Sequence, residues 1–295
     1  MSLAITMVSA FEEFGFMRRS LVACFALSLS LTPLGVLLML RRMSLIGDAL
    51  SHAVLPGVAI GYLLSGMSLV AMGTGGFIAG LLVALLSGWI SRATGLREDS
   101  SFAGLYLGSL ALGVTLISLR SSGVDLLHLL FGSLLAVDKP ALLFIGGIAT
   151  ATLVVLSIGL RALVIESFNA DFMRVNRPWL PGIIHALFLA LLVMNLVAGF
   201  QILGTLMTVG LMMLPAIAAR CWSERLGVIL PLAALIGLIC SLTGLLISWI
   251  WSLPAGPAIV LVACGFFLFS TLVNGLWGKL TRNPKRDDEV IHEVD

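Results

Sequence analysis

Long apolar stretches recur along the whole chain, and they constrain its fold more than any other feature. A helix needs about 20 predominantly apolar residues to cross a bilayer. Composition agrees, because only 11% of the 295 residues are charged, against about 25% in soluble domains. We therefore expect an all-α polytopic membrane bundle of about nine transmembrane helices. The expected spans are 20–40, 44–64, 69–91, 102–119, 141–160, 180–198, 201–217, 227–250 and 256–277.

The regions between and around these stretches define the expected organisation. The amphipathic stretch 119–140 favours a loop with a short surface helix, so eight spans plus a re-entrant or interfacial helix is the alternative. Residues 1–17 are expected to form an interfacial lead-in, since their short apolar run precedes charged residues without a clear signal-peptide cleavage site. Residues 18–278 would form the membrane domain, and residues 279–295 a polar cytoplasmic tail.

The basic residues predict the orientation, because Lys and Arg concentrate in cytoplasmic loops. With nine spans, thirteen of the seventeen basic residues fall on one side, which we take as cytoplasmic, with the N-terminus outside and the C-terminus inside. The exceptions are Arg18, Arg19, Arg120 and Lys139. The thirteen are Arg41, Arg42, Arg92, Arg97, Arg161, Arg174, Arg177, Arg220, Arg225, Lys279, Arg282, Lys285 and Arg286.

Asp48 and His52 are the ionisable pair that the sequence places inside a predicted span. Of the fifteen acidic residues, only Asp48 falls within a span by this prediction, and a charge in the hydrocarbon core costs several kcal/mol, about 2.5–3.5 on insertion scales. The i, i+4 spacing puts both side chains on one helical face. They lie about 9 Å and about 15 Å beyond Arg42 along a helix axis.

A Pro-Gly step follows this pair. Pro56 has no N–H to donate to the carbonyl of His52, and Gly57 comes next. We therefore predict a helix kink at Pro56 and Gly57, of the kind that lines sites in transporters.

A carboxylate beside an imidazole suits Zn²⁺, Mn²⁺ or Fe²⁺. Two ligands are too few for a closed site, so water or the same pair from a second subunit would complete it. The alternatives are that Asp48 and His52 pair as structural glue, or that they relay protons in a secondary carrier.

Other candidate residues carry weaker signals. A packing role is favoured for His185, for the Met-rich run 207–216 and for the four cysteines over metal ligation. A surface pair is expected at Asp125 and His128, and His292 lies in the polar tail. The chain has no GxxxxGK[ST] motif for ATP hydrolysis and no HExxH motif of zinc proteases.

Three segments make the chain resemble the permease family of bacterial zinc, manganese and iron ABC importers. They are RRMSLIGDALSHAVLPGVAIGYLL (41–64), VGLMMLPAIAAR (209–220) and GLLISWIWSLPAGPAIV (244–260). The resemblance covers about residues 16–277. The first segment is the most specific, because it joins an intramembrane Asp and His to a fixed Pro-Gly.

The resemblance implies partners that composition does not show. Two permeases would pair as a homodimer in the bacterial inner membrane, two copies of a cytoplasmic ATPase would hydrolyse the ATP, and an extracytoplasmic protein would deliver the metal, zinc first and then manganese or iron. The permease would itself be no enzyme, with no intrinsic cofactor and no nucleic-acid partner. A proton-coupled secondary metal carrier is the alternative function.

The resemblance also implies roles for individual residues. Asp48 and His52 would lie on the metal path. The family often has an acidic residue at the position of Ser252, which this chain lacks. A coupling segment at Leu214–Leu226 would dock on the ATPase through Pro215, Ala219, Arg220, Ser223 and Glu224.

Overall fold

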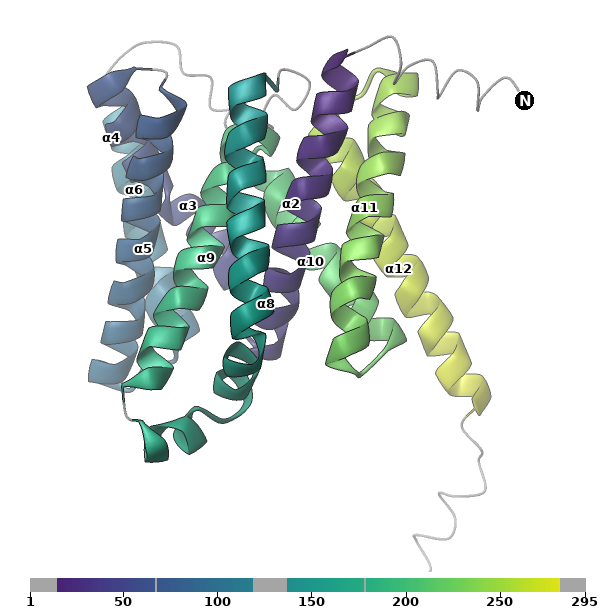
Figure 1. The fold of residues 1–295 in the computed structure, drawn as a ribbon. Helices are drawn as coiled ribbons and strands as arrows, with labels where there is room; N and C mark the ends of the chain where they lie inside the picture. The colour runs from purple at the N-terminus through teal and green to yellow at the C-terminus, as the bar shows by residue number, and fades with distance from the viewer. Residues whose placement is uncertain (1–14, 67, 119–136, 178, 282–295) are drawn as a thin grey trace, which may run out of the picture.

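The chain folds into a bundle of roughly parallel and antiparallel helices (Figure 1). The computed structural model describes residues 15–66, 68–118, 137–177 and 179–281, and this part of the chain contains no β-strand. The helices are α2 (Gly15–Leu40), α3 (Ile46–Ala53), α4 (Leu55–Ser65), α5 (Leu69–Thr94), α6 (Glu98–Ser118), α8 (Lys139–Asn176), α9 (Leu180–Leu203), α10 (Thr205–Trp222), α11 (Leu226–Trp251) and α12 (Ala255–Thr281).

The all-α membrane bundle predicted from the sequence is confirmed. Among the described residues, eight segments are long and apolar enough to cross a membrane, with α3 and α4 counted together as one. The helix α6 (Glu98–Ser118) covers residues 102–118 of the remaining predicted span, 102–119. Most of the amphipathic stretch 119–140 lies outside the described residues, as do residues 1–14 and 282–295.

The helix α8 differs most from the prediction. The expected span was 141–160, but α8 continues without a break from Lys139 to Asn176. Glu166, which the sequence analysis assigned to a loop, is therefore a helical residue. The prediction was wrong because Arg161 was read as the end of the span, whereas a long helix can carry charged residues on the turns that leave the hydrocarbon.

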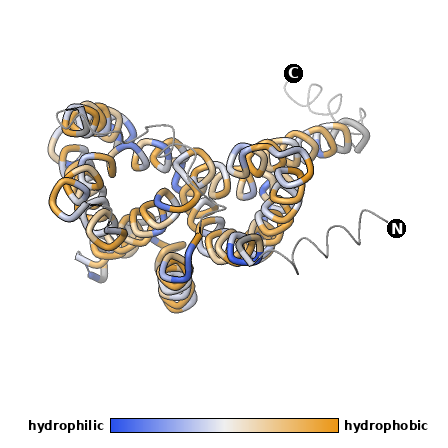
Figure 2. Tube along the Cα trace, turned by 90° about the horizontal axis from the view of Figure 1, so that it is seen from above, coloured by the Kyte–Doolittle hydropathy of each residue, from blue (hydrophilic) through white to orange (hydrophobic). Residues whose placement is uncertain are grey.

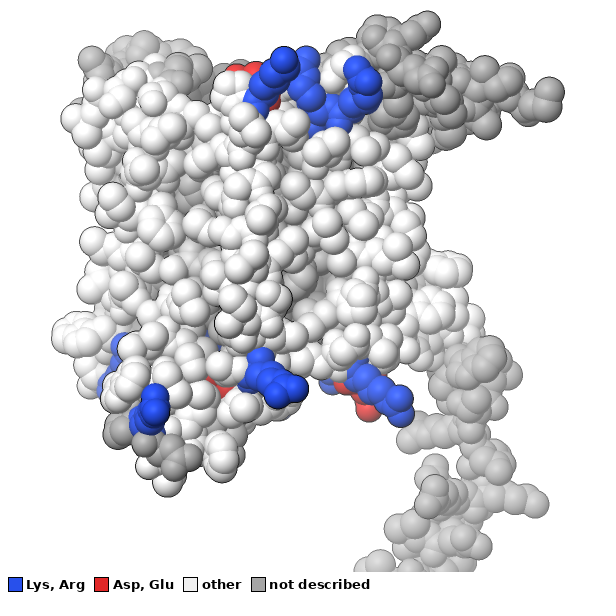
Figure 3. All heavy atoms as spheres, in the orientation of Figure 1, with Lys and Arg blue, Asp and Glu red and all other residues white. Residues whose placement is uncertain are grey.

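Charged side chains gather near the two ends of the bundle. In the face shown in Figure 3, Lys and Arg form bands at the top and the bottom, with uncharged side chains between them. Exposed side chains of the middle region are apolar, for example Ile78, Ile158, Leu261 and Leu272. An uncharged band between two charged rims is the surface that a bilayer requires.

The most buried spans of the bundle are α2, α9 and the span made of α3 and α4. In each of these three spans 67% of the membrane-spanning window is buried, compared with 17% in α12. Seen along the helices, the bundle consists of two groups that lie side by side (Figure 2). One group contains α3, α4, α5, α6 and α9, and the other contains α2, α10, α11 and α12. The helix α8 packs on both α2 and α9 and so joins the groups.

Small residues allow α4 and α5 to pack with their backbones in contact. A Cβ atom at Gly57 would overlap the carbonyl of Gly75, and one at Gly61 would overlap the carbonyl of Ala71. Such small residues spaced four apart are a common way for membrane helices to approach closely. This contact holds the second half of the broken span against the bundle.

Candidate functional site

The span that contains Asp48 is broken into two short helices. The first half, α3, ends at Ala53, and the second half, α4, begins at Leu55, with Val54 between them. Pro56 is in the first turn of α4, where its missing N–H costs least. The Val54 carbonyl accepts hydrogen bonds from the N–H groups of both Gly57 and Val58, each at 3.1 Å. The interruption lies beside Pro56 and Gly57.

Asp48 and His52 lie at opposite ends of α3. Asp48 is in the first turn and His52 in the last turn. The His52 Nε2 atom is 4.0 Å from the Asp48 Oδ1 atom, and the side chains are 28% and 67% exposed. That distance is too long for a hydrogen bond, so the two groups share a face without closing on each other.

The helix α6 forms the wall beside this pair. The ring of Tyr106 lies 6.4 Å from the ring of His52, centroid to centroid. The hydroxyl of Ser109 donates a hydrogen bond of 2.9 Å to the carbonyl of Ala53, at the end of α3. Gly113 leaves room for the break itself, because a Cβ there would come within 3.0 Å of the Pro56 nitrogen. The wall therefore fixes α3 and supports the ring of His52.

The spacing of the pair suits a divalent metal ion as a passing substrate. Two ligands at bond lengths of about 2.1 Å around a tetrahedral ion lie about 3.4 Å apart, so a small side-chain rotation would bring both groups onto one ion. Among the described residues, no group of three or more His, Cys, Asp and Glu side chains could hold a metal ion. A metal ion bound at this pair would need further ligands from water or from outside the described residues.

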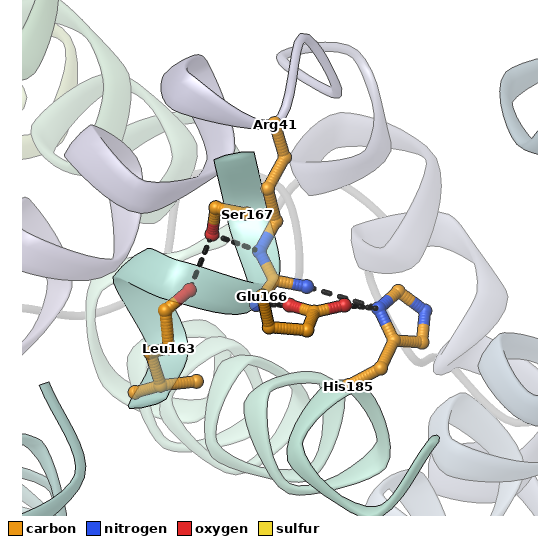
Figure 4. Close-up of polar contacts among 5 residues, drawn as sticks. All are labelled: Arg41, Leu163, Glu166, Ser167 and His185. Atoms are coloured by element: carbon orange, nitrogen blue, oxygen red, sulfur yellow. Dashed lines mark hydrogen bonds and ion pairs between the residues drawn. The ribbon is translucent and has the colours of Figure 1, made fainter. Parts of the chain in front are cut away.

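A second polar cluster, which the sequence analysis missed, lies between α2, α8 and α9 (Figure 4). The guanidinium of Arg41 forms an ion pair with Glu166 and donates hydrogen bonds to His185 Nδ1 at 2.9 Å and to Ser167 Oγ at 3.1 Å. It also stacks over the ring of Phe188 at 4.0 Å. The side chains of Arg41 and Glu166 are only 4% and 10% exposed.

The contact with Arg41 selects one tautomer of a neutral His185 ring. Arginine has only donors, so the short Arg41 contact makes Nδ1 of His185 an acceptor and places the proton of a neutral ring on Nε2. The Glu166 carboxylate lies 3.6 Å from the same nitrogen. His185, isolated in the sequence, is therefore part of a polar network. Its partners come from positions 144 and 19 residues away, and no local pattern signals such pairings.

The predicted coupling segment comprises the end of α10 and the connection to α11. Pro215 and Ala219 are buried within α10. Arg220 and Glu224 are exposed, and Ser223 is partly exposed. Ser223 accepts a hydrogen bond of 3.1 Å from the N–H of Arg225. The helix α10 continues to Trp222, so Pro215 and Ala219 belong to the helix and not to the connection that follows it.

The weaker candidates of the sequence take packing positions where the structure describes them. Met207, Met212 and Met213 are buried, and so are Cys24 and Cys240. Ser252 is exposed and caps α11 with a left-handed φ of 53°. Asp125, His128 and His292 lie outside the described residues.

Comparison with known proteins identifies the family. Residues 13–274 match the ABC 3 transport family. The manganese transport system membrane protein MntC of Halalkalibacterium halodurans is 34% identical, over 92% of this chain and 91% of that protein. The chelated iron transport system membrane protein YfeD of Yersinia pestis is 29% identical, over 93% and 91%.

A solved structure agrees with this match. A chain of PsaBC from Streptococcus pneumoniae, in complex with a Fab, is 31% identical over 91% of this chain and 95% of that chain, with a TM-score of 0.80. The chain belongs to the ABC 3 transport family, and the resemblance to permeases of metal ABC importers is confirmed.

Proposed function

We propose that this chain is the membrane-spanning permease of an ATP-driven importer for a divalent transition-metal ion. The ion would pass from an extracytoplasmic binding protein to the cytoplasm. The observation that carries the proposal is the open Asp48–His52 pair on an interrupted helix within an apolar bundle. Intramembrane ionisable residues are costly and mark ion pathways.

The exposure of Asp48 supports a paired arrangement. A carboxylate that is 67% exposed would be costly against lipid, so its face requires either water or protein. A second copy of the chain, placed with its α3 against this face, would exclude lipid and bring a second Asp48–His52 pair. Four ligands from two chains match the number that a divalent transition metal commonly takes. We therefore propose a homodimer with the metal path between the copies.

Manganese ranks ahead of zinc as the transported ion. The residues left Zn²⁺, Mn²⁺ and Fe²⁺ open, and the family resemblance favoured zinc, followed by manganese or iron. The relative of Halalkalibacterium halodurans is named for manganese and that of Yersinia pestis for chelated iron. Oxygen ligands also suit Mn²⁺, and Asp48 is the more exposed member of the pair.

ATP hydrolysis would come from a separate cytoplasmic subunit, since the chain lacks a GxxxxGK[ST] motif. The exposed residues Arg220, Ser223 and Glu224 would contact that ATPase. They lie at the same end of the bundle as Arg97 and Arg177, and the positive-inside rule makes this end cytoplasmic.

The test is Mn²⁺ uptake by proteoliposomes that contain the chain with its ATPase and binding protein. We expect Asp48→Asn and His52→Ala each to reduce uptake by about a hundredfold or more, because each removes half of the ligands that one chain offers. Asp99→Asn is the matched control and should leave uptake unchanged. Asp99 is also in the first turn of a helix, but its carboxylate has a cation beside it, the Arg97 guanidinium at 3.8 Å.

Normal uptake by both variants would contradict the site. Uptake that needs no ATPase would instead support the proton-coupled carrier. If Zn²⁺ or Fe²⁺ is transported and Mn²⁺ is not, the ranking of the metals is wrong while the permease function stands.

A further inference from the structure

Met212 lies between the predicted coupling segment and the Asp48–His52 pair. It belongs to α10, which continues from Met212 to Trp222 without a break and then leads to Ser223 and Glu224. Ser223 is eleven positions after Met212, which corresponds to about 16 Å at the rise of an α-helix, and Pro215 lies within this stretch. The Met212 side chain is fully buried, at 0% exposure.

Met212 packs against two glycines, which lie on two different helices. On α2, a Cβ at Gly35 would overlap the main-chain carbonyl of Met212. On the other side, a Cβ at Gly47 would overlap the terminal methyl group of Met212. Gly47 is buried in the first turn of α3 and immediately precedes Asp48. The backbone of α10 is thus held against α2 while its side chain reaches the start of α3.

At Gly47 itself, two side-chain atoms of the described residues lie within 4 Å of an added Cβ, the Met212 methyl and the Leu38 Cδ1 atom at 3.6 Å. The rest of α3 packs mainly against α6, and also against α5 and α9. Because packed interiors have few voids, a shift of α10 displaces what its side chains touch. A movement of α10 at Met212 would therefore either shift the first turn of α3 at Gly47 or leave a gap there, while Ser109 of α6 holds the other end of α3 at Ala53.

We propose that Met212 is the positioning residue through which movement of the ATPase-facing end of α10 reaches Asp48. This inference rests on the proposed function. In it, ATP-driven displacement of the segment around Arg220 and Glu224 moves α10, and the Met212 methyl moves the first turn of α3. The orientation of the Asp48 carboxylate then depends on the state of the ATPase, which links metal release to the ATP cycle.

The test measures Mn²⁺ transported per ATP hydrolysed, in proteoliposomes that contain the complete complex. Met212→Leu keeps an apolar side chain but removes the terminal methyl that reaches Gly47. We expect ATP hydrolysis to continue and the transport ratio to fall about fivefold or more, the lower range of coupling between distant sites. Met207→Leu is the matched control, since Met207 is equally buried on α10 and its ratio should be unchanged.

A complementary pair of substitutions separates coupling from general packing. Gly47→Ala adds a methyl group where the Met212 methyl lies, so it should also lower the ratio. In the double variant with Met212→Leu, the alanine methyl occupies the space that the Met212 methyl filled. The transport ratio should then recover toward that of the wild type. The double variant also decides the question if Met212→Leu alone fails to assemble.

Three results would overturn the inference. These are a wild-type ratio in Met212→Leu, an equal loss in Met207→Leu, or a double variant that is no better than the single ones. A wild-type complex that transports no metal ion at all would overturn the proposed function instead, so the two failures are distinguishable.

Discussion

The described part of the chain holds two pairs of a carboxylate and an imidazole, and they differ in how completely the protein surrounds them. Asp48 and His52 come from one short helix, stand 4.0 Å apart and are 67% and 28% exposed. Glu166 and His185 come from different helices, are 10% and 16% exposed, and share Arg41 as a partner. The charge of Glu166 is balanced within the fold by Arg41. The Asp48 carboxylate and the His52 imidazole remain available to a ligand.

This difference indicates two uses for the same residue types. A buried network with matched charges ties helices together, here α2, α8 and α9, and it leaves no coordination position for an ion. An exposed pair without a balancing partner in its own chain remains accessible to a ligand or a second subunit. We therefore expect substitutions in the Arg41 cluster to act on folding, and substitutions at Asp48 to act on metal ions.

Arg41→Met should have the largest effect on the free energy of unfolding. It leaves the Glu166 carboxylate buried without its cation, and breaking a buried pair in this way costs about 3–5 kcal/mol. Denaturant titration of the purified chain in detergent micelles measures the loss.

The control for this prediction replaces the whole cluster. Arg41→Met, Glu166→Leu and His185→Leu together should recover most of the lost stability, because apolar replacement of a complete buried ion network is often neutral or stabilising. A triple variant that is less stable than Arg41→Met alone would contradict the view that charge balance is what the cluster provides.

Mn²⁺ should stabilise the wild-type chain through the open pair, with an effect of intermediate size. A ligand that binds only the folded state adds about 2.7 kcal/mol at a hundred times its Kd. Thermal unfolding in a Mn²⁺ series measures the gain, which should vanish in Asp48→Asn and persist in Arg220→Gln. Equal stabilisation of Asp48→Asn would show that the ion binds elsewhere.

Asp48→Asn should have the smallest effect on unfolding without metal, within about 0.5 kcal/mol of the wild type. Its carboxylate is exposed and makes no short contact with His52, so little native interaction is lost. The same titration used for Arg41→Met measures it. A loss as large as that of Arg41→Met would erase the distinction between the two pairs.

Local sequence was sufficient for the spans and for the Asp48–His52 pair. Apolar runs of span length specify membrane helices because the bilayer leaves the backbone no other way to satisfy its hydrogen bonds. Once the segment is helical, the i, i+4 spacing alone places Asp48 and His52 on one face. The length of α8 was missed, because charged residues such as Arg161 and Glu166 end a hydropathy segment without ending a helix.

Tertiary packing alone decided the partners of His185, the burial of Pro215 and Ala219, and the contact of Met212 with Gly47. Each depends on which helices are neighbours, and a periodic apolar sequence does not encode that choice, since many faces of a membrane helix are equally apolar. Small residues such as Gly35 and Gly47 select the neighbours by permitting close approach. Their role becomes visible only when the helix opposite each one is known.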